Sequence, residues 1–133
     1  TNSPNQLVEV IAMLRHFLLV DDSAISRVMV KSLIEDNFED TLISEADSGE
    51  QAIERCGAEK FDAIFLDLNM PGQDGLTIAP KLKELCPDAK VALLTANFQE
   101  RVKVKAEELG LRFYAKPVTL EIVQDFIAND DVA

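Results

Sequence analysis

The chain has 133 residues, which suits one domain, and 47% of them are hydrophobic, which is enough for a core and too many for a disordered segment. A formal net charge of −11 excludes the cationic surface that binds nucleic-acid backbones, so we expect no direct nucleic-acid partner. No apolar run reaches the roughly 18 residues of a membrane span, and no secretion signal is evident. We therefore expect a cytoplasmic protein that does not insert into membranes.

Strand-like and helix-like segments alternate along most of the chain. We expect strands at His16–Val20, Thr41–Ala46, Phe61–Leu66, Ala89–Leu94 and Leu111–Ala115. We expect helices at about Ala24–Asp36, Gly49–Cys56, Gly75–Leu85, Phe98–Leu109 and Leu120–Ala128. Five strand–helix units in succession predict an α/β domain, residues 15–130, with a parallel sheet covered by helices on both faces. Residues 1–14 precede this pattern as an N-terminal extension or an added, non-native segment.

Several residues predict how individual helices begin and end. Ser48 and Gln51 form a capping box at the start of the second helix, and Gly57 is expected to end it. Thr119 is expected to cap the last helix. Pro80 lies inside the third helix, where it removes one backbone hydrogen bond, so we expect a tolerated kink or a later helix start.

The cysteines and the single histidine suggest no chemistry of their own. Cys56 and Cys86 are the only cysteines and form no C-x-x-C motif, so two buried, reduced thiols are favoured over a disulfide. His16 could serve as a phosphotransfer histidine or a metal ligand. A lone histidine without a neighbouring ligand set is more often structural, and we prefer that interpretation.

Polar residues follow four of the five predicted strands. They are Asp21 and Asp22 after the first strand, Asp67 after the third, Thr95 after the fourth and Lys116 after the fifth. Because the carboxyl ends of parallel strands meet at one edge of the sheet, we expect these side chains to share a pocket. Three close carboxylates repel each other unless a hard divalent cation lies among them, so the pattern predicts a Mg²⁺ site with one carboxylate available as a nucleophile. A hydroxyl and an ammonium suit the binding of anionic oxygens opposite the metal.

Each of these residues also has a structural explanation when taken alone. Asp67 could simply cap the turn that follows it, Thr95 could be a β-branched residue that ends a strand, and Lys116 could be a solvated surface lysine. The occurrence of all of them at strand ends is what favours a functional site.

The chain resembles the receiver domain of bacterial two-component response regulators, of the chemotaxis type, over about residues 16–128. The resemblance rests on four motifs, which are Leu-Leu-Val-Asp21-Asp22-Ser, Leu66-Asp67-Leu-Asn-Met70-Pro71-Gly-x-Asp74-Gly75, Leu-Leu-Thr95-Ala96 and Lys116-Pro117. It implies a doubly wound, flavodoxin-like (βα)₅ fold with strand order 2-1-3-4-5 and a site at the point where that order reverses.

The resemblance also implies roles for the acidic residues. Asp67 corresponds to the phosphoacceptor. Asp22 and Asp67 would bind Mg²⁺ through their side chains and Asn69 through its backbone carbonyl, whereas Asp21 would act largely through water.

Further roles follow for residues of the last two strand ends. Thr95 and Lys116 would bind phosphoryl oxygens, and Pro117 corresponds to the family's cis proline. The family's switch aromatic lies three residues before the lysine, at Phe113. The stretch from Thr95 to Lys116 is one residue shorter than in chemotaxis-type relatives, so Tyr114 takes that role if the register shifts. The two side chains point to opposite faces of the strand, so only one should serve.

The function implied by the resemblance is that of a signalling phosphoacceptor, not an enzyme. A sensor histidine kinase or phosphotransfer protein would phosphorylate Asp67, and a downstream target would bind the face of residues 98–128, which could also form a homodimer. One alternative is an aspartyl-phosphate phosphatase, but Asn69 stands where a second acidic residue is required. The other is a non-phosphorylated protein-binding scaffold, which a degraded pocket would mark.

Overall fold

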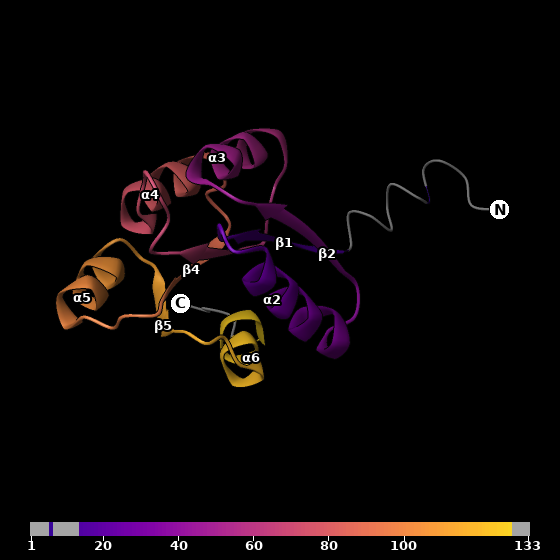
Figure 1. Ribbon diagram of the computed structural model, residues 1–133. Coiled ribbons are helices and arrows are strands. Elements are labelled where there is room, and N and C mark those ends of the chain that lie inside the picture. The colour runs from indigo at the N-terminus through magenta and orange to yellow at the C-terminus, as the bar shows by residue number, and fades with distance from the viewer. Residues whose placement is uncertain (1–5, 7–13, 129–133) are drawn as a thin grey trace.

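A five-stranded parallel sheet forms the centre of the computed structural model, which describes Gln6 and residues 14–128 (Figure 1). The strands are β1 (Arg15–Val20), β2 (Thr41–Ala46), β3 (Ala63–Asp67), β4 (Lys90–Thr95) and β5 (Arg112–Ala115). Their order in the sheet is β2-β1-β3-β4-β5, and every neighbouring pair is parallel. The predicted flavodoxin-like order is confirmed.

Helices cover both faces of this sheet. They are α2 (Ala24–Asn37), α3 (Gly49–Ala58), α4 (Gly75–Leu85), α5 (Glu100–Glu108) and α6 (Leu120–Ala128). The first core cluster joins the sheet to α3, α4 and α5, and the second joins it to α2 and α6. The observed bounds lie within two residues of the predicted ones. No helix among the described residues is long and apolar enough to span a membrane.

The central strands are apolar on both faces because both faces are covered. Along β3, Ile64 and Leu66 pack in the first cluster, whereas Phe65 packs in the second, where its ring meets that of Phe126 edge-on at 5.0 Å. All four side chains are at most 2% exposed. Successive residues of a strand point to opposite faces, so one short apolar run supplies both halves of the core. This rigid strand ends at Asp67.

The predicted end of the second helix at Gly57 is wrong. Helix α3 continues to Ala58, and the N–H of Glu59 donates to the carbonyl of Arg55 at 2.8 Å. Only Gly72 and Gly110 among the described glycines have a positive φ. Gly57 therefore keeps a helical backbone and does not form the left-handed turn that a glycine at a helix end often adopts.

The capping interactions agree with the predictions except in one bond. Ser48 Oγ accepts the N–H of Gln51 at 3.1 Å, but the Gln51 side chain accepts the N–H of Asp47 at 2.9 Å, one residue earlier than in a standard capping box. Thr119 Oγ1 accepts the N–H of Ile122 at 3.3 Å, as expected of a cap. Helix α4 begins at Gly75 and contains Pro80, so the proline does not delay the helix start.

The histidine and the cysteines have structural surroundings. His16 Nε2 lies 2.9 Å from Ser44 Oγ, and its ring contacts Phe61 with centroids 4.5 Å apart. Cys56 and Cys86 are buried, free thiols, as predicted. Burial, together with the neighbouring Cys86, raises the pKa of Cys56 to about 12, which disfavours the reactive thiolate.

Replacing Gly57 with alanine is expected to stabilise the protein by about 0.5–1 kcal/mol, because a helical glycine loses more backbone freedom on folding than alanine does. A Cβ at this exposed position would have no atom within 4 Å, so no clash offsets the gain. Urea unfolding followed by circular dichroism measures the change. A loss of stability would instead indicate a left-handed glycine that ends the helix.

Candidate functional site

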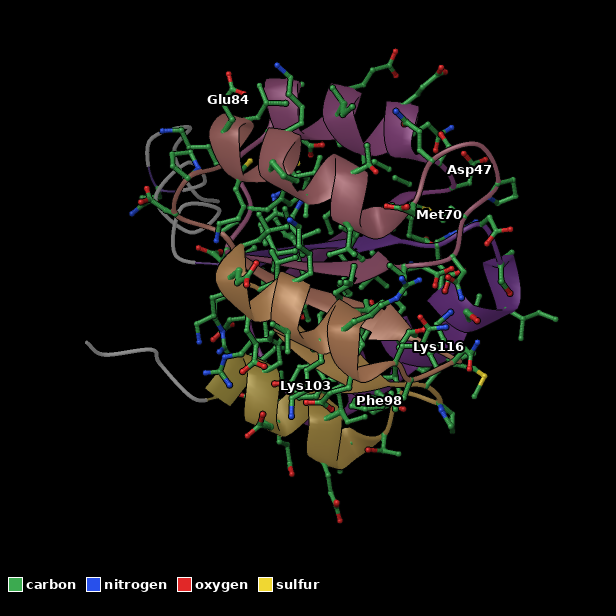
Figure 2. The ribbon with its side chains drawn as sticks, turned by 90° about the vertical axis from the view of Figure 1, so that its left-hand side faces the viewer. Asp47, Met70, Glu84, Phe98, Lys103 and Lys116 are labelled. Carbon is green, nitrogen blue, oxygen red and sulfur yellow. The ribbon has the colours of Figure 1, made fainter. Side chains whose placement is uncertain are left out.

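The carboxyl ends of four strands bring the predicted site residues together. Asp21 follows β1, Asp67 ends β3, Thr95 ends β4 and Lys116 follows β5. Lys116 Nζ lies 2.9 Å from Asp21 Oδ2 and 3.4 Å from Asp67 Oδ1. Figure 2 shows Met70, Lys116 and Phe98 at the carboxyl end of the strands, with Glu84 at the opposite end of the molecule.

Three carboxylates gather at this edge. One oxygen each from Asp21, Asp22 and Asp67 lies within 4.8 Å of the other two. Asp21 is 7% exposed and Asp67 is 4% exposed, whereas Asp22 lies open to solvent. Carboxylate oxygens are the ligands that hard divalent cations prefer, and the exposed Asp22 leaves the cluster accessible. The donor set of these residues therefore fits a metal such as Mg²⁺.

The charges of the site act on one another. Burial is the main reason why the pKa of Asp67 is raised; Lys116 opposes this effect, and the neighbouring Asp21 adds to it. Burial alone would lower the pKa of Lys116, but its hydrogen bond to Asp21 and the charge of Asp67 together raise it. The lysine is thus held in its charged form, and it partly compensates the cost of two buried carboxylates.

Short backbone contacts fix the orientation of these side chains. Asp21 Oδ1 accepts the N–H of Ser23 at 2.9 Å, and Asp67 Oδ1 accepts the N–H of Asn69 at 3.3 Å. The N–H of Lys116 donates to the carbonyl of Thr95 at 2.7 Å, which ties the end of β5 to that of β4. The following Lys116–Pro117 peptide bond is cis.

Thr95 is fully buried and bonded to its own loop. Its Oγ1 donates to the carbonyl of Asn97 and accepts the N–H of Asn97, both at 3.1 Å. Thr95 pairs with Ala115 across the sheet, and Leu93 pairs with Phe113. Phe113 therefore lies on the same face of the sheet as Thr95.

The two candidate aromatics lie on different faces. Phe113 packs against the cluster of α3, α4 and α5, and its ring lies 5.5 Å from that of Phe98. Tyr114 packs on the α6 face and donates to Asp125 Oδ2 at 2.6 Å. Burial, then the hydrogen bond to Asp125, raises the pKa of Tyr114. Only Phe113 shares a face with Thr95.

Gly75 packs against the end of β3, and no role beyond the motif was predicted for it from the sequence. Its N–H donates to the carbonyl of Leu68 at 2.9 Å. A Cβ there would lie 2.8 Å from the carbonyl oxygen of Asp67 and 2.6 Å from Leu93 Cδ1. The first turn of α4 thus packs directly on the end of β3. The Asp74-Gly75 pair at a helix start was the signal available in the sequence.

A comparison with known families agrees with this arrangement. Residues 17–128 match the family described as response regulator receiver domain. The chain belongs to this family. Receiver domains act as phosphoacceptors in two-component signalling and interact with histidine kinases and downstream targets.

Curated relatives include short and long proteins. The receiver chain is 31% identical to the chemotaxis protein CheY of Bacillus subtilis over 117 residues, which is 86% of this chain and 96% of CheY. It is 34% identical to CheY of Listeria monocytogenes over 102 residues, which is 75% of this chain and 84% of that CheY. It is 37% identical to the nitrate/nitrite response regulator NarL of Escherichia coli over 97 residues, 73% of this chain but 45% of NarL. The chain thus spans less than half of the longer regulators.

Solved structures show the same fold. One is a response regulator from Burkholderia pseudomallei, solved with a phosphorylated aspartic acid, a calcium ion and citrate. It matches this receiver with a TM-score of 0.75 and 27% sequence identity. The match covers 85% of this chain and 66% of the Burkholderia chain. A response regulator from Thermotoga maritima also has a TM-score of 0.75, at 25% identity, with 88% and 100% of the two chains covered.

Replacing Gly75 with alanine is expected to destabilise the receiver by about 1–3 kcal/mol, the usual cost of forcing extra volume into a packed contact. The reason is that the added Cβ meets backbone atoms of Asp67 and Leu68, which cannot move as a flexible side-chain end can. Urea unfolding measures the effect, with Gly57→Ala as the matched control. Unchanged stability in Gly75→Ala would show that α4 does not press on the strand end.

Proposed function

We propose that this receiver accepts a phosphoryl group on Asp67 from the phosphohistidine of a sensor histidine kinase or phosphotransfer protein, and then changes its binding of a downstream partner. The observation that carries the proposal is the position of Lys116 Nζ between Asp21 and Asp67, beside an accessible acidic cluster. The phosphorylated aspartic acid of the Burkholderia relative supports it.

The side chains of Asp22 and Asp67, the backbone carbonyl of Asn69 and, largely through water, Asp21 would hold Mg²⁺. When bound, the ion neutralises charge on the phosphoryl oxygens of the donor. The structure of the Burkholderia relative contains a calcium ion, which supports the binding of a divalent cation by this receiver. Asn69 follows Asp67 by two residues, and its N–H already contacts the Asp67 carboxylate.

The residues of the chain divide the work of transfer. An ionised Asp67 oxygen attacks the phosphorus; the P–O bond forms while the P–N bond to the donor histidine breaks, and the bonding pair returns to the imidazole nitrogen. Lys116 favours the ionised nucleophile and binds a phosphoryl oxygen, and Thr95 binds another. Hydrolysis of the acyl phosphate by water later restores the carboxylate.

The switch would begin at Thr95. Its hydroxyl is bonded to the backbone of Asn97, and turning toward a phosphoryl oxygen would release that bond. Phe113 lies on the same face and contacts the half-exposed Phe98, so it is the aromatic best placed to respond. The change would reach the face of residues 98–128, which would bind the downstream target or a second copy of the chain. This is a shift between two populated states, biased by local charge.

The two alternative functions receive less support. An aspartyl-phosphate phosphatase would use an acidic residue where Asn69 stands. A scaffold without phosphorylation would not need the buried Asp67, its lysine partner and the accessible carboxylates to remain together.

Incubation of the receiver with Mg²⁺ and a small-molecule phosphodonor is expected to add one phosphoryl group to the protein. Mass spectrometry of the intact protein measures this gain. A chelator, or the substitution Asp67→Asn, is expected to abolish the gain, because each removes a group required for the transfer. Asp47→Asn serves as a matched control, because Asp47 is an exposed carboxylate at the same edge and lies outside the cluster (Figure 2). Equal phosphorylation of Asp67→Asn would place the acceptor elsewhere.

We expect the protein that donates the phosphoryl group, a histidine kinase or phosphotransfer protein, to dock over helix α2. Ile25, Val28 and Met29 are large apolar side chains that remain exposed on this helix. Met29 also lines a small cavity with Lys116 and Pro117, so the patch reaches the site itself. Exposed apolar groups beside a polar site mark a protein-binding surface. A partner seated there would present its phosphohistidine to Asp67.

The test uses a histidine kinase that phosphorylates the wild-type receiver. Val28→Gln is expected to slow phosphotransfer from this kinase by roughly fivefold to tenfold, because it removes one apolar contact of the docking surface. Phosphorylation by the small-molecule donor should not change. Val104→Gln is the matched control: it makes the same exchange on α5, where the valine is 47% exposed compared with 59% at Val28. Equal effects of the two variants on transfer would contradict docking over α2.

A further inference from the structure

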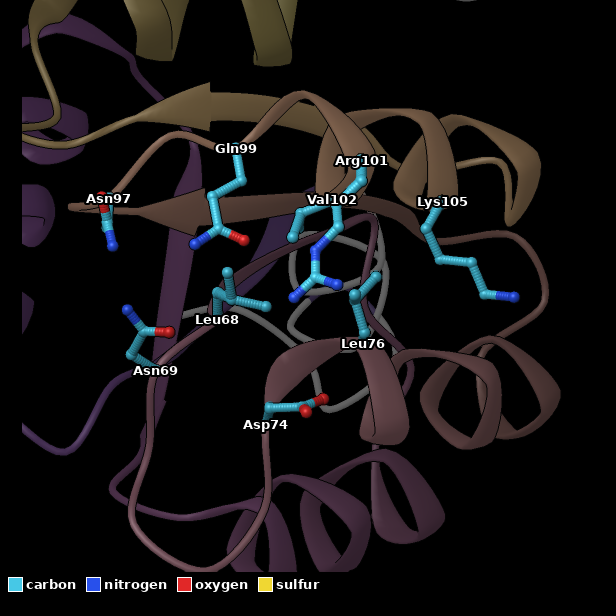
Figure 3. A pocket seen from close by; sticks show the side chains of 9 residues that line it. All are labelled: Leu68, Asn69, Asp74, Leu76, Asn97, Gln99, Arg101, Val102 and Lys105. Atoms are coloured by element: carbon cyan, nitrogen blue, oxygen red, sulfur yellow. The ribbon is translucent and has the colours of Figure 1, made fainter.

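A groove of about 460 Å³ lies between α4 and α5, beside the phosphorylation site (Figure 3). Its apolar wall is made by Leu68, Leu76 and Val102, and the side-chain amides of Asn69, Asn97 and Gln99 lie at the end nearest the site. Its volume falls within the range of roughly 300–1,000 Å³ that is typical of small-molecule pockets. The combination of an apolar wall with a few polar groups is also typical of such pockets.

Two cations line this groove in a strongly acidic protein. Arg101 and Lys105 are four residues apart on α5 and therefore lie on one side of the helix. Within residues 14–128 as described, neither forms an ion pair, whereas Arg27 and Arg55 each pair with a glutamate. Figure 3 shows the Arg101 guanidinium directed into the groove, between Leu68 and Leu76.

The one carboxylate of the groove does not occupy these cations. Asp74 Oδ1 accepts the N–H and the hydroxyl of Thr77, at 2.8 and 3.0 Å, and thereby caps α4. The chain has a formal net charge of −11, and Arg101 and Lys105 give this groove a local positive charge. A guanidinium beside an apolar wall is suited to a carboxylate or phosphate group.

We infer that this groove binds a small organic anion, with its apolar body against Leu68, Leu76 and Val102 and its anionic group paired with Arg101 and Lys105. The amides of Asn97 and Gln99 offer both donors and acceptors for further polar groups. The site is separate from the acidic cluster, and binding there requires neither phosphorylation nor a metal.

An occupant would influence the receiver through α5. Gln99 makes no side-chain capping bond to α5, and Ala106 is the only residue of α5 that is buried. A ligand held between α4 and α5 would fix a helix that few buried contacts hold. Asn69 and Asn97, which line the groove, each lie two residues past a site residue, Asp67 and Thr95. The effect on phosphorylation rests on the proposed function; the binding itself does not.

Titration of the unphosphorylated, metal-free protein with benzoate and 2-naphthoate tests the proposal, monitored by ¹H–¹⁵N NMR at constant ionic strength. Saturable shifts are expected at the backbone amides of Leu68, Asn69 and Val102, with dissociation constants up to roughly 10 mM. Benzamide and 2-naphthamide, of nearly the same shape without the charge, should bind at least about fivefold more weakly.

Arg101→Gln and Lys105→Gln should each weaken the binding of the carboxylates by roughly fivefold to tenfold. Lys103→Gln is the matched control, because it removes the same charge from α5 but lies in a different groove with Arg112 and Tyr114. The proposal is overturned if no saturable shift occurs at the groove, if the neutral amides bind equally well, or if Lys103→Gln has the same effect. None of these outcomes bears on Asp67 as the phosphoacceptor.

Discussion

The ion pairs of Lys116 with two buried carboxylates are the interactions on which the site depends. Asp21 follows β1 and Asp67 ends the neighbouring strand β3, so the sheet order brings two like charges together in a poorly solvated place. Lys116 follows β5, the outermost strand on one side of the sheet, and its side chain reaches Asp21 past the carboxyl ends of β4 and β3. Removing one partner of such a buried group leaves an uncompensated charge, which costs far more than a surface ion pair contributes.

The burial of these charged groups lowers the stability of the fold, but it holds them in positions that suit the proposed phosphoryl transfer. Burial raises the pKa of Asp67, and Lys116 acts against that shift. The proposed nucleophile would have to be ionised to react, so the lysine would favour its reactive form. A fully solvated carboxylate would be easier to accommodate, but it would be surrounded by water and less well directed. Perturbed titration of this kind is typical of functional sites, because the fold holds groups where isolated side chains would not remain. The rigid, doubly covered β3 strand supplies the necessary support.

The strands and the clustering of polar residues at their ends could be predicted because they depend on simple periodic rules. Apolar runs covered on both faces indicate parallel strands, and polar residues at the ends of parallel strands meet at one edge. The end of α3 could not be predicted in this way, because Gly57 accepts both helical and left-handed backbones and its surroundings decide between them. The close contact of Gly75 with Asp67 depends on how α4 docks, which no local pattern specifies. Likewise, the face of Phe113 follows from the register of β5 against β4.

Helix α5 connects the chemistry of the site with the outer surface. Its preceding loop holds the hydroxyl of Thr95 through Asn97, and Phe98 in the same loop contacts Phe113. Because α5 has one fully buried residue and no side-chain cap, small forces from either end can shift it against the sheet. In the proposed switch, the hydroxyl of Thr95 would act on the start of this helix, and a ligand in the groove beside α4 would act on its side. On these two proposals, signals of different chemistry would bias the same element, and both would be read out by the surface to which α5 belongs.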